Sequence, residues 1–339
     1  MANHNPIQHS NSSARFAAVG AGRMGRGIAI AFAYAGYRIA LIDLRDRSDA
    51  AWQALRNDAR AEIDGVLGGL VELEVIRDDQ VARIAQRIEL VPAHNAADAL
   101  AAVGMAIECV PETIEAKQNA FGHISRHCSE TAILTSTTSS IPVTELAGIV
   151  QHPERFLNTH WLNPAYVVPL VEVSFHPRTD KHVLAHTQSV LESIGKLPVT
   201  CGPATGYIVP RLQALIMNEA ARMVEEGVAT VEQIDKATRY GLGLRFASIG
   251  VIEFIDYGGC DILYHASKTM ERIDKTRFAA PRIVAEKMQN NELGLKTESG
   301  FYSYDDCNIP AYRKDVLERT LSLLRHVDML RDPADDTIA

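Results

Sequence analysis

The sequence predicts an α/β domain followed by an all-α domain. Up to about residue 200, short apolar segments of strand type alternate with helical segments, which is typical of a mostly parallel sheet covered by helices. From Tyr207 onward the amphipathic spacing is almost entirely helical. We therefore expect an α/β domain over residues 15–200, a helical domain over residues 201–339, and a flexible tail over residues 1–14.

The first strand and turn carry a dinucleotide-binding pattern. Phe16–Val19 is a short apolar run, and Gly20, Gly22 and Gly25 follow it with the spacing G-x-G-x-x-G. The first glycine allows a tight turn, the second lets the backbone approach a pyrophosphate, and the third brings helix and strand close together. We therefore expect a dinucleotide-binding unit with phosphates at the helix start. Met24, within this pattern, is included among the expected cofactor-binding residues.

The second predicted strand, Arg38–Ile42, ends at an acidic residue. Asp43 lies 23 residues after Gly20, where a carboxylate accepts hydrogen bonds from the adenosine ribose hydroxyls. Because this carboxylate would repel a 2′-phosphate, it favours NAD over NADP as the cofactor. Arg45 and Arg47 could accommodate such a phosphate, but Asp43 itself argues for NAD.

The remaining elements of the first domain follow in order. Residues 48–87 show helical periodicity broken near Gly65–Leu70, which predicts an antiparallel helix pair inserted into the domain. Ile114–His127 is predicted to be a helix between two of the later strands. The later predicted strands are Ile88–Leu90, Met105–Cys109, Ala132–Thr135, Phe156–Thr159, Leu170–Phe175 and Leu197–Thr200.

The second domain is predicted to be a series of amphipathic helices. A further helix, Val316–Leu330, has an apolar face that we expect to pack on the helical domain or on a partner subunit, and an acidic end follows it. The preceding predicted helices are Arg211–Glu226, Val231–Tyr240, Ile249–Tyr257, Ile262–Ile273 and Ala280–Asn290.

Composition excludes several classes of protein. No apolar run of the 339 residues approaches the roughly 18 residues that a membrane span needs, and the first residues lack the apolar core of a signal peptide. With 34 basic and 42 acidic residues, the net charge of −8 lacks the electrostatic footprint of a nucleic-acid-binding protein. We expect no membrane or nucleic-acid partner and a cytoplasmic protein with buried free thiols rather than disulfides or a metal site. The cysteines are Cys109, Cys128, Cys201, Cys260 and Cys307.

The stretch Arg155–Phe175 holds the strongest catalytic candidate. His160 ends one apolar strand and Glu172 lies within the next. A histidine that takes a proton near neutral pH needs a neighbour that fixes its tautomer and stabilises its charged form, and a carboxylate does both. A core or capping role is commoner for an isolated histidine, but a nearby acid and a nicotinamide site reverse that balance. The hydroxyls of Ser136–Pro142 either bond a substrate oxygen or cap the following helix.

Six short segments of the chain carry a further pattern: GAGRMGRGIA at 20–29, ECVPE at 108–112, STTSSIP at 136–142, HWLNP at 160–164, LVEV at 170–173 and GLKTESGFYSY at 294–304. In this order, from Phe16 to Tyr304, they resemble the L-3-hydroxyacyl-CoA dehydrogenase family. The resemblance implies a Rossmann-like N-terminal domain and a helical C-terminal domain that usually dimerises, so we expect a homodimer. It also implies NAD-dependent oxidation of a hydroxyl on the β-carbon of an acid or thioester.

The resemblance also implies roles for particular residues. His160 matches the catalytic histidine of the family, and Glu172 matches the acid that orients it. Ser139 matches the serine that bonds the reacting substrate oxygen. Glu108 and Lys117 match an acid and a lysine near the nicotinamide half of the cofactor.

Two departures from the family pattern bear on activity and substrate. Pro210 in GYIVPRLQ stands where the family has an asparagine. The side-chain amide of that asparagine would contact the substrate, and losing one such hydrogen-bond donor costs on the order of 10²-fold in rate. Pro210 motivates an alternative, a non-catalytic NAD-binding protein of the kind recruited as a crystallin.

The second departure is Arg245 in GLGLRFASIG, where acyl-CoA enzymes tend to have an uncharged residue. It resembles the branch that includes L-gulonate dehydrogenase, lambda-crystallin and carnitine dehydrogenase, in which an arginine could grip a substrate carboxylate bidentately. A surface or interdomain salt bridge is the other explanation. The substrate therefore stays open between a free β-hydroxy acid and a short 3-hydroxyacyl-CoA.

Overall fold

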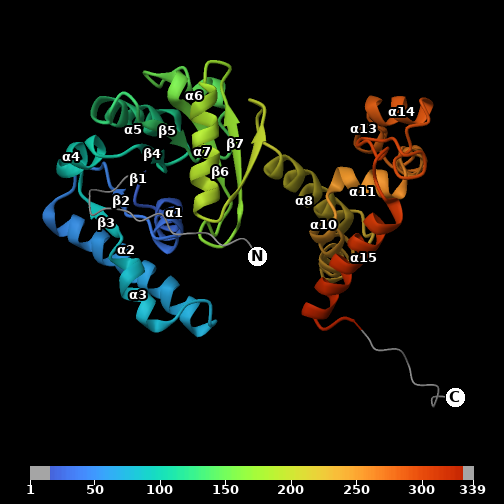
Figure 1. The fold of residues 1–339 in the computed structure, drawn as a ribbon, viewed down its shortest axis with the longest axis horizontal. Helices are drawn as coiled ribbons and strands as arrows, with labels where there is room; N and C mark the ends of the chain where they lie inside the picture. Colours follow the sequence, from blue (N-terminus) through green and yellow to red (C-terminus); the bar gives the residue numbers. More distant parts are fainter. Residues whose placement is uncertain (1–15, 331–339) are drawn as a thin grey trace, which may run out of the picture. The chain divides into compact units, whose positions relative to one another are not determined.

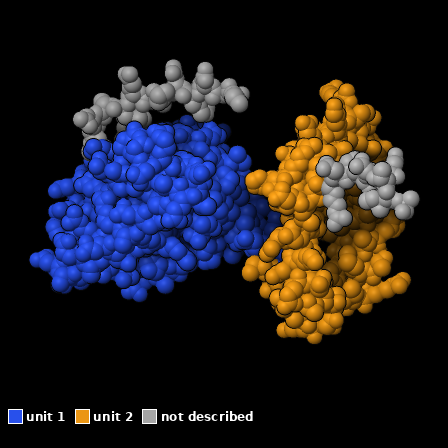
Figure 2. Space-filling model, turned by 90° about the horizontal axis from the view of Figure 1, so that it is seen from below, with its two compact units in different colours: residues 1–216 blue, residues 217–339 orange. Residues whose placement is uncertain are grey.

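The computed structural model describes residues 16–330, so the predicted tail over residues 1–14 and the acidic end of the chain lie outside the described residues. The chain divides into two compact units, Met1–Ile216 and Met217–Ala339 (Figure 2). The last strand ends at Cys201, and the division between the units falls within helix α8 (Val209–Glu225).

Unit 1 contains an eight-stranded sheet with the order β3-β2-β1-β4-β5-β6-β7-β8 (Figure 1). Strands β1 to β6 are parallel, β7 is antiparallel to β6, and β8 is parallel to β7. The predicted Rossmann-like, mostly parallel sheet is therefore confirmed. The strands are β1 (Phe16–Val19), β2 (Ile39–Ile42), β3 (Ile88–Val91), β4 (Met105–Glu108), β5 (Ile133–Ser136), β6 (Phe156–Trp161), β7 (Leu170–Phe175) and β8 (Leu197–Cys201).

The helices of unit 1 connect these strands. Short 3-10 turns lie at Ala93–Asn95 and Pro153–Arg155. The helices are α1 (Arg23–Tyr34), α2 (Asp49–Glu72), α3 (Asp78–Ala85), α4 (Ala96–Ala101), α5 (Ile114–His127), α6 (Val143–Leu146) and α7 (Lys181–Ser193).

The inserted helix pair is present as α2 and α3, but the predicted break near Gly65–Leu70 is wrong. Helix α2 continues through that stretch because Ile63 and Leu67, one helical turn apart, are both fully buried in the core. The chain instead reverses after Glu72, where Glu74 takes a left-handed backbone with φ of 59°. Burial of apolar side chains therefore outweighs the low helix propensity of the glycines.

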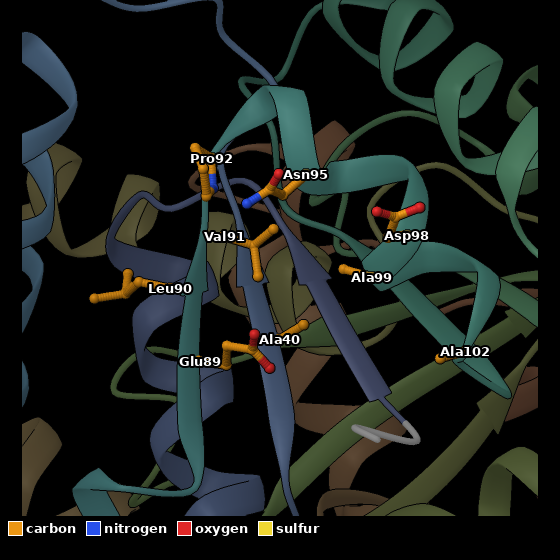
Figure 3. A pocket seen from close by; sticks show the side chains of 9 residues that line it. All are labelled: Ala40, Glu89, Leu90, Val91, Pro92, Asn95, Asp98, Ala99 and Ala102. Carbon is orange, nitrogen blue, oxygen red and sulfur yellow. The ribbon is translucent and has the colours of Figure 1, made fainter. Parts of the chain in front are cut away.

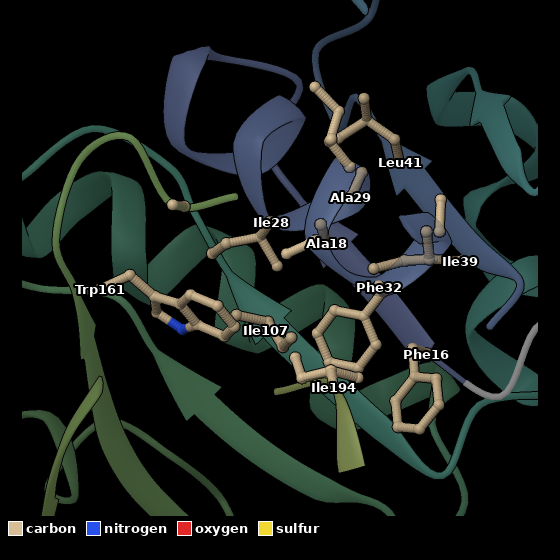
Figure 4. Packing of buried hydrophobic residues seen from close by; sticks show 14 of the residues in the cluster. Phe16, Ala18, Ile28, Ala29, Phe32, Ile39, Leu41, Ile107, Trp161 and Ile194 are labelled. Carbon is tan, nitrogen blue, oxygen red and sulfur yellow. The ribbon is translucent and has the colours of Figure 1, made fainter. Parts of the chain in front are cut away.

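The core of unit 1 lies on both faces of the sheet. Phe16 and Ala18 of β1 pack in one buried cluster, whereas Ala17 and Val19 pack in another. Because side chains of a strand alternate between faces, a strand covered by helices on both sides is apolar throughout. Figure 4 shows rings from β1, α1 and β6 meeting in the first cluster, where the centroids of Phe16 and Phe32 are 4.7 Å apart. This packing fixes the start of β1 against the last turns of α1.

Unit 2 is helical, as predicted. The predicted helix Val231–Tyr240 is a short α-helix that continues into a π-helical turn, η3 (Thr238–Gly243). A hairpin-like loop over residues 294–304 separates the last two helices. The α-helices after α8 are α9 (Val231–Ala237), α10 (Leu244–Ser248), α11 (Val251–Gly258), α12 (Cys260–Met270), α13 (Lys275–Phe278), α14 (Arg282–Gln289) and α15 (Ile309–His326).

The last helix begins and ends earlier than predicted. Helix α15 starts at Ile309 because the side chain of Asn308 accepts a hydrogen bond from the Ala311 amide and Pro310 fits the first turn. It contacts α10 within unit 2. On its predicted apolar face Val316 is buried, but Leu317 is 55% exposed, so that face is only partly covered within this chain.

The state of the cysteines and the character of the helices bear on two expectations drawn from composition. All five cysteines are free, and Cys109, Cys128 and Cys260 are buried. Burial raises the pKa of the Cys128 thiol to about 11, which keeps it protonated at neutral pH. Between residues 16 and 330, no helix has the length and apolar character needed to cross a membrane.

Candidate functional site

The glycine turn between β1 and α1 has room for a ligand at one of its three glycines. Gly20 has φ of 124°, and a Cβ there would lie 2.6 Å from the carbonyl oxygen of Cys109. A Cβ on Gly25 would lie 2.0 Å from the carbonyl oxygen of Gly20. A Cβ on Gly22, by contrast, would meet nothing within 4 Å. The first and third glycines are therefore required by packing, and the second faces open space.

The start of α1 suits an anion. The first helical hydrogen bond runs from the amide of Arg26 to the carbonyl of Gly22 at 2.9 Å, so the amides before it have no partner within the helix. Such amides bind phosphate groups. Met24 is half-buried and packs against the core. The open space at Gly22 and the free amides together fit the pyrophosphate of NAD.

The guanidinium of Arg26 does not face this site. Arg26 is buried and forms ion pairs with Asp58, at 2.7 Å, and with Glu62 of α2. Its Nε donates to the carbonyl of Ala21 at 3.0 Å. Arg26 therefore joins the dinucleotide-binding turn to the inserted helix pair.

Asp43 follows β2 directly, as predicted, and its carboxylate is already ion-paired. The amide of Asp43 donates to the carbonyl of Val91 at 3.0 Å, which fixes its backbone at the carboxyl end of the sheet. The Nε of Arg47 donates to Oδ2 of the same residue. Arg47 therefore neutralises the acid that was predicted to bind the ribose, and Arg45 approaches it only through its amide, at 3.5 Å from Oδ1.

Glu108 and Lys117 form a fully buried ion pair. The Nζ of Lys117 lies 2.9 Å and 3.1 Å from the two carboxylate oxygens of Glu108. Ser136 donates to the same carboxylate at 2.5 Å. Burial raises the pKa of Glu108, and the charge of Lys117 opposes this rise only in part. The structure brings these two residues together at the end of β4, and their contact with the cofactor stays a prediction.

Glu112, which sequence reasoning did not single out, organises the serine loop, defined as residues 137–142. Its Oε1 accepts hydrogen bonds from Oγ1 of Thr138 at 2.5 Å and from the amides of Ser139 and Ser140 at 2.8 and 3.0 Å. Its Oε2 lies 3.2 Å from Lys117. Burial alone would raise the pKa of Glu112, but the Thr138 hydrogen bond and the charge of Lys117 lower it to about 2. The sequence does contain a pattern that points to Glu112 as a site residue, because ECVPE places an acid just past the end of a strand.

His160 and Glu172 are directly opposite each other across the antiparallel pair β6 and β7. The Nδ1 of His160 lies 2.7 Å from Oε2 of Glu172, which is fully buried. Burial tends to raise the pKa of Glu172, but the hydrogen bonds from His160 and from two backbone amides lower it. Because the ionised carboxylate only accepts, Nδ1 carries the proton. Nε2 then keeps its lone pair, and it forms no hydrogen bond with residues 16–330.

The second oxygen of Glu172 fixes the start of α8. The amides of Ile208 and Val209 both donate to Oε1 of Glu172 at 2.8 Å. The amide of Arg211 donates to the carbonyl of Gly206 at 3.0 Å. Pro210 has no N–H, so every amide donor from residue 208 to residue 211 has a partner. The proline that departs from the family pattern therefore suits the first turn of this helix.

Tyr207 stacks on His160, and this contact had no signal in the sequence. The two ring centroids are 4.9 Å apart and the ring planes differ by 7°. The Tyr207 hydroxyl donates to the carbonyl of Thr138 at 2.9 Å and accepts from Nδ2 of Asn158 at 3.0 Å. The position of the ring depends on the backbone at Gly206 and Tyr207, both of which have positive φ. Periodicity cannot reveal such a conformation.

Arg245 lies in unit 2, directly after the π-helical turn. Its guanidinium lies over the ring of Phe254, 5.7 Å from the centroid. It is exposed, and it forms no ion pair with residues 217–330. A salt bridge within its own unit therefore does not explain this arginine.

A hollow of about 410 Å³ lies beside the edge strand β3 and helix α4 (Figure 3). Its lining includes Ala40, Val91 and two carboxylates, Glu89 and Asp98. None of the predicted site residues lines it. The two acids disfavour a phosphate group, so we do not assign this hollow to the cofactor.

The sequence matches known domains along most of its length. Residues 15–204 match the NAD-binding domain of 3-hydroxyacyl-CoA dehydrogenase, and residues 206–304 match the C-terminal domain of the same family. The change from one domain to the other therefore comes between β8 and α8.

Characterised relatives share about 30% of their residues with this chain. The 5-formyl-3-hydroxy-2-methylpyridine 4-carboxylate 5-dehydrogenase of Mesorhizobium japonicum is 28% identical over 91% of this chain and 96% of its own length. The 3-hydroxybutyryl-CoA dehydrogenase of Mycobacterium tuberculosis is 31% identical over 87% of this chain and all of its own. The crystal structure of a 3-hydroxyacyl-CoA dehydrogenase from Archaeoglobus fulgidus covers 94% of this chain and all of its own, with 30% identity and a TM-score of 0.72. This chain belongs to the 3-hydroxyacyl-CoA dehydrogenase family and is an NAD-binding oxidoreductase.

Proposed function

We propose that this protein reversibly oxidises the β-hydroxyl of a free 3-hydroxy acid or a short 3-hydroxyacyl-CoA to the 3-oxo product, with His160 as the base. The observation that carries the proposal is the 2.7 Å contact between Nδ1 of His160 and the buried carboxylate of Glu172. It leaves Nε2 as the proton acceptor. A neutral imidazole oriented by an anion is the arrangement that general base catalysis needs near neutral pH.

The proton follows a short path in this proposal. Nε2 of His160 takes the proton of the substrate hydroxyl, and the charge of the resulting imidazolium is stabilised by Glu172. NAD, when bound, supplies the acceptor for the hydride. In the reverse direction the same imidazolium returns the proton to the carbonyl oxygen. Glu172 stays ionised throughout because its pKa is lowered by its hydrogen bonds.

Ser139 is proposed to bond the reacting oxygen. Its amide is held by Glu112 at 2.8 Å, whereas its hydroxyl lies 3.4 Å from the same carboxylate oxygen. The second distance is at the long limit of a hydrogen bond, so the hydroxyl is free to turn to a substrate oxygen at little cost. Glu108 and Lys117 are proposed to lie near the nicotinamide half of the cofactor, and Asp43 near the ribose.

The substrate class rests on Arg245. An exposed arginine that forms no ion pair with residues 217–330 is available to bind a carboxylate bidentately. The name of the Mesorhizobium relative describes a substrate with a free carboxylate, whereas that of the Mycobacterium relative describes a CoA ester. Arg245 favours the free acid over the CoA ester.

A substrate panel tests the proposed function. We expect NADH formation with free 3-hydroxy acids, with their CoA esters, or with both, measured as initial rates at equal enzyme concentration. NADH binding without turnover of any member would favour the alternative, a non-catalytic NAD-binding protein. Formation of NADPH at a higher rate than NADH would contradict the role of Asp43.

Substitution of Arg245→Leu tests the carboxylate contact. We expect a higher KM for a free-acid substrate, because a bidentate charge pair is lost, with kcat nearly unchanged. If only thioesters are turned over and the variant behaves as wild type, the carboxylate contact is wrong.

We also propose a cytoplasmic homodimer formed through the helical domain. Large apolar side chains of α8 and the turn after it are exposed, including Leu215 at 70%, Met217 at 67% and Val228 at 60%. Apolar patches of this kind are typical of subunit interfaces. Light scattering of the purified protein measures its mass in solution, and a monomer at micromolar concentration would contradict the dimer.

A further inference from the structure

Tyr207 is held in a backbone conformation that is unfavourable for a bulky residue. Its φ is 44°, and Gly206 before it has φ of 79°. A left-handed backbone is common for glycine but costs free energy for a tyrosine, so it persists only where the surroundings fix it. Tyr207 as a whole is only 6% exposed, so its ring is buried. The contacts of that ring therefore explain why the conformation is kept.

The hydroxyl of Tyr207 connects two segments of the site. It donates to the carbonyl of Thr138 and accepts from Nδ2 of Asn158, which also donates to the carbonyl of Ile141 at 3.2 Å. Thr138 and Ile141 flank the two serines at the tip of the serine loop. Asn158 is two residues before His160 in β6, so both side chains project from the same face of the sheet. The hydroxyl and the amide thus attach both sides of that tip to the strand that carries the base.

This attachment does not serve stability alone. The bonds to Tyr207 and Ile141 determine that Nδ2 points at both acceptors, which leaves Oδ1 of Asn158 without a hydrogen-bond partner among residues 16–330. A buried, unsatisfied acceptor costs about 1–3 kcal/mol. An apolar residue at this position would avoid that cost, but it could not hold the loop.

The imidazole needs a second constraint besides Glu172. One hydrogen bond at Nδ1 fixes the tautomer, but it allows the ring to tilt about the bond axis. The parallel ring of Tyr207 restricts that tilt, because a stacked pair at 4.9 Å loses contact when either ring turns. Catalytic groups must be held within about 10–20° of their productive orientation.

We propose that Tyr207 is a positioning residue for the reaction: its ring fixes the plane of the His160 imidazole, and its hydroxyl, together with Asn158, fixes the serine loop relative to that ring. The proposal rests on the proposed function of His160 and Ser139. It assigns Tyr207 no contact with the reacting atoms. The base and the serine hydroxyl are then kept in one geometry by a single side chain.

Substitution of Tyr207→Phe tests the hydroxyl while retaining the stacked ring. We expect kcat to fall about 10-fold with KM and the Kd of NADH within twofold of wild type, because the Thr138 side of the serine loop loses its attachment. Asn158→Ala should lower kcat similarly, and the double variant should be no slower than the slower single variant, since both act on one loop. A Tyr207→Phe enzyme with kcat within twofold of wild type would overturn the role of the hydroxyl.

Tyr304→Phe is the matched control for the loss of a buried phenol hydroxyl. Tyr304 is also 6% exposed and its hydroxyl donates to Asp256 at 3.2 Å, in unit 2. We expect both variants to lose similar stability in urea, but only Tyr207→Phe to lose kcat. Equal kcat losses at equal stability losses would show that Tyr207 acts through stability alone.

The role of the ring is tested by Tyr207→Leu and ¹⁵N NMR of His160. In the wild type we expect one neutral tautomer with the proton on Nδ1, and in Tyr207→Leu a broadened or mixed signal that Tyr207→Phe restores. An unchanged His160 signal in Tyr207→Leu would contradict the stacking role. If His160→Gln retains turnover, the proposed base is wrong; if it abolishes turnover while the Tyr207 variants behave as wild type, only the positioning role is wrong.

Discussion

Glu172 in unit 1 and Asp256 in unit 2 are both fully buried carboxylates that accept two backbone amides. Glu172 accepts from Ile208 and Val209, and Asp256 accepts from Phe301 at 2.9 Å and Tyr302 at 2.8 Å. They differ in their third donor. Glu172 accepts from the imidazole of His160, whose other ring nitrogen can take up a proton, whereas Asp256 accepts from the phenol of Tyr304, whose pKa burial raises well above its ordinary value.

That difference separates a proton-transfer site from a structural one. The phenol of Tyr304 stays protonated at any physiological pH, so the Asp256 cluster only holds the loop over residues 294–304. The loop packs tightly against Asp256, because a Cβ on Gly294 would lie 2.2 Å from the Asp256 carbonyl oxygen and a Cβ on Gly300 would lie 2.3 Å from the Asp256 carboxylate. This close packing supports a structural role for Asp256. Glu172 lies in a segment that resembles the family and Asp256 binds another such segment, residues 294–304, so resemblance alone does not distinguish their roles.

The largest expected effect is on the activity of a Glu172→Gln variant. The amide oxygen can still accept from Ile208 and Val209, but the amide nitrogen would face Nδ1 of His160 and favour the wrong tautomer. We expect kcat to fall by at least about 10²-fold, measured as steady-state NADH formation at saturating substrate. A variant with more than a third of the wild-type kcat would remove the distinction between the two carboxylates.

The counterpart in unit 2, Asp256→Asn, is expected to change stability rather than chemistry. The substitution replaces one carboxylate oxygen by an amide nitrogen, so that two N–H donors face each other. We expect a loss of about 2–3 kcal/mol in the free energy of unfolding. Urea unfolding and NADH titration measure the two quantities separately, and the Kd of NADH should stay within twofold. A 10²-fold loss of kcat in a protein of unchanged stability would contradict the structural role.

The depressed pKa of Glu112 predicts a smaller effect that depends on pH. Because the pKa falls from 4.5 to about 2 on folding, the stabilisation from this carboxylate is complete above about pH 4.5 and is lost as the pH falls towards 2. The stability gap between the wild type and Glu112→Gln should therefore be largest at pH 6 and smaller at pH 2.5, measured by urea unfolding. A gap that is constant between these pH values would contradict the ion pair and hydrogen bonds assigned to Glu112.

The smallest expected effect is that of Tyr304→Phe. Loss of one hydrogen bond to a carboxylate should cost about 1–2 kcal/mol of unfolding free energy and leave kcat within twofold of wild type. Stability is measured in urea and activity by NADH formation. A larger effect on kcat than on stability would indicate that the loop over residues 294–304 takes part in the reaction.

The sequence predicted the order of elements well where burial decides them. Helix Ile114–His127 and strand Leu170–Phe175 have the predicted bounds, because apolar periodicity there agrees with the packing. The predicted division of the helix pair is wrong, since the apparent break in helical periodicity near Gly65–Leu70 lies where buried Ile63 and Leu67 keep α2 continuous. The residue types suggest that Glu172 lies near His160, and the register of β6 and β7 places the two side chains in contact, while their roles in the reaction stay predictions.

Other features of the site depend on geometry that residue patterns do not encode. The stacking of Tyr207 on His160 follows from a left-handed backbone at two successive residues. The pairing of Asp43 with Arg47 follows from the path of the chain after β2, whereas the sequence alone suggests that Arg47 could accommodate a 2′-phosphate. The hydrophobic periodicity of the sequence around these residues does not predict such contacts.

A His160→Gln variant tests most directly whether His160 is the base. Turnover of the best substrate from the panel and fluorescence titration of NADH are measured on the same preparation. We expect turnover to fall by about 10²-fold or more while the Kd of NADH stays within twofold, because the dinucleotide turn lies on other strands. A variant that retains more than about a tenth of the wild-type rate would contradict the role of His160.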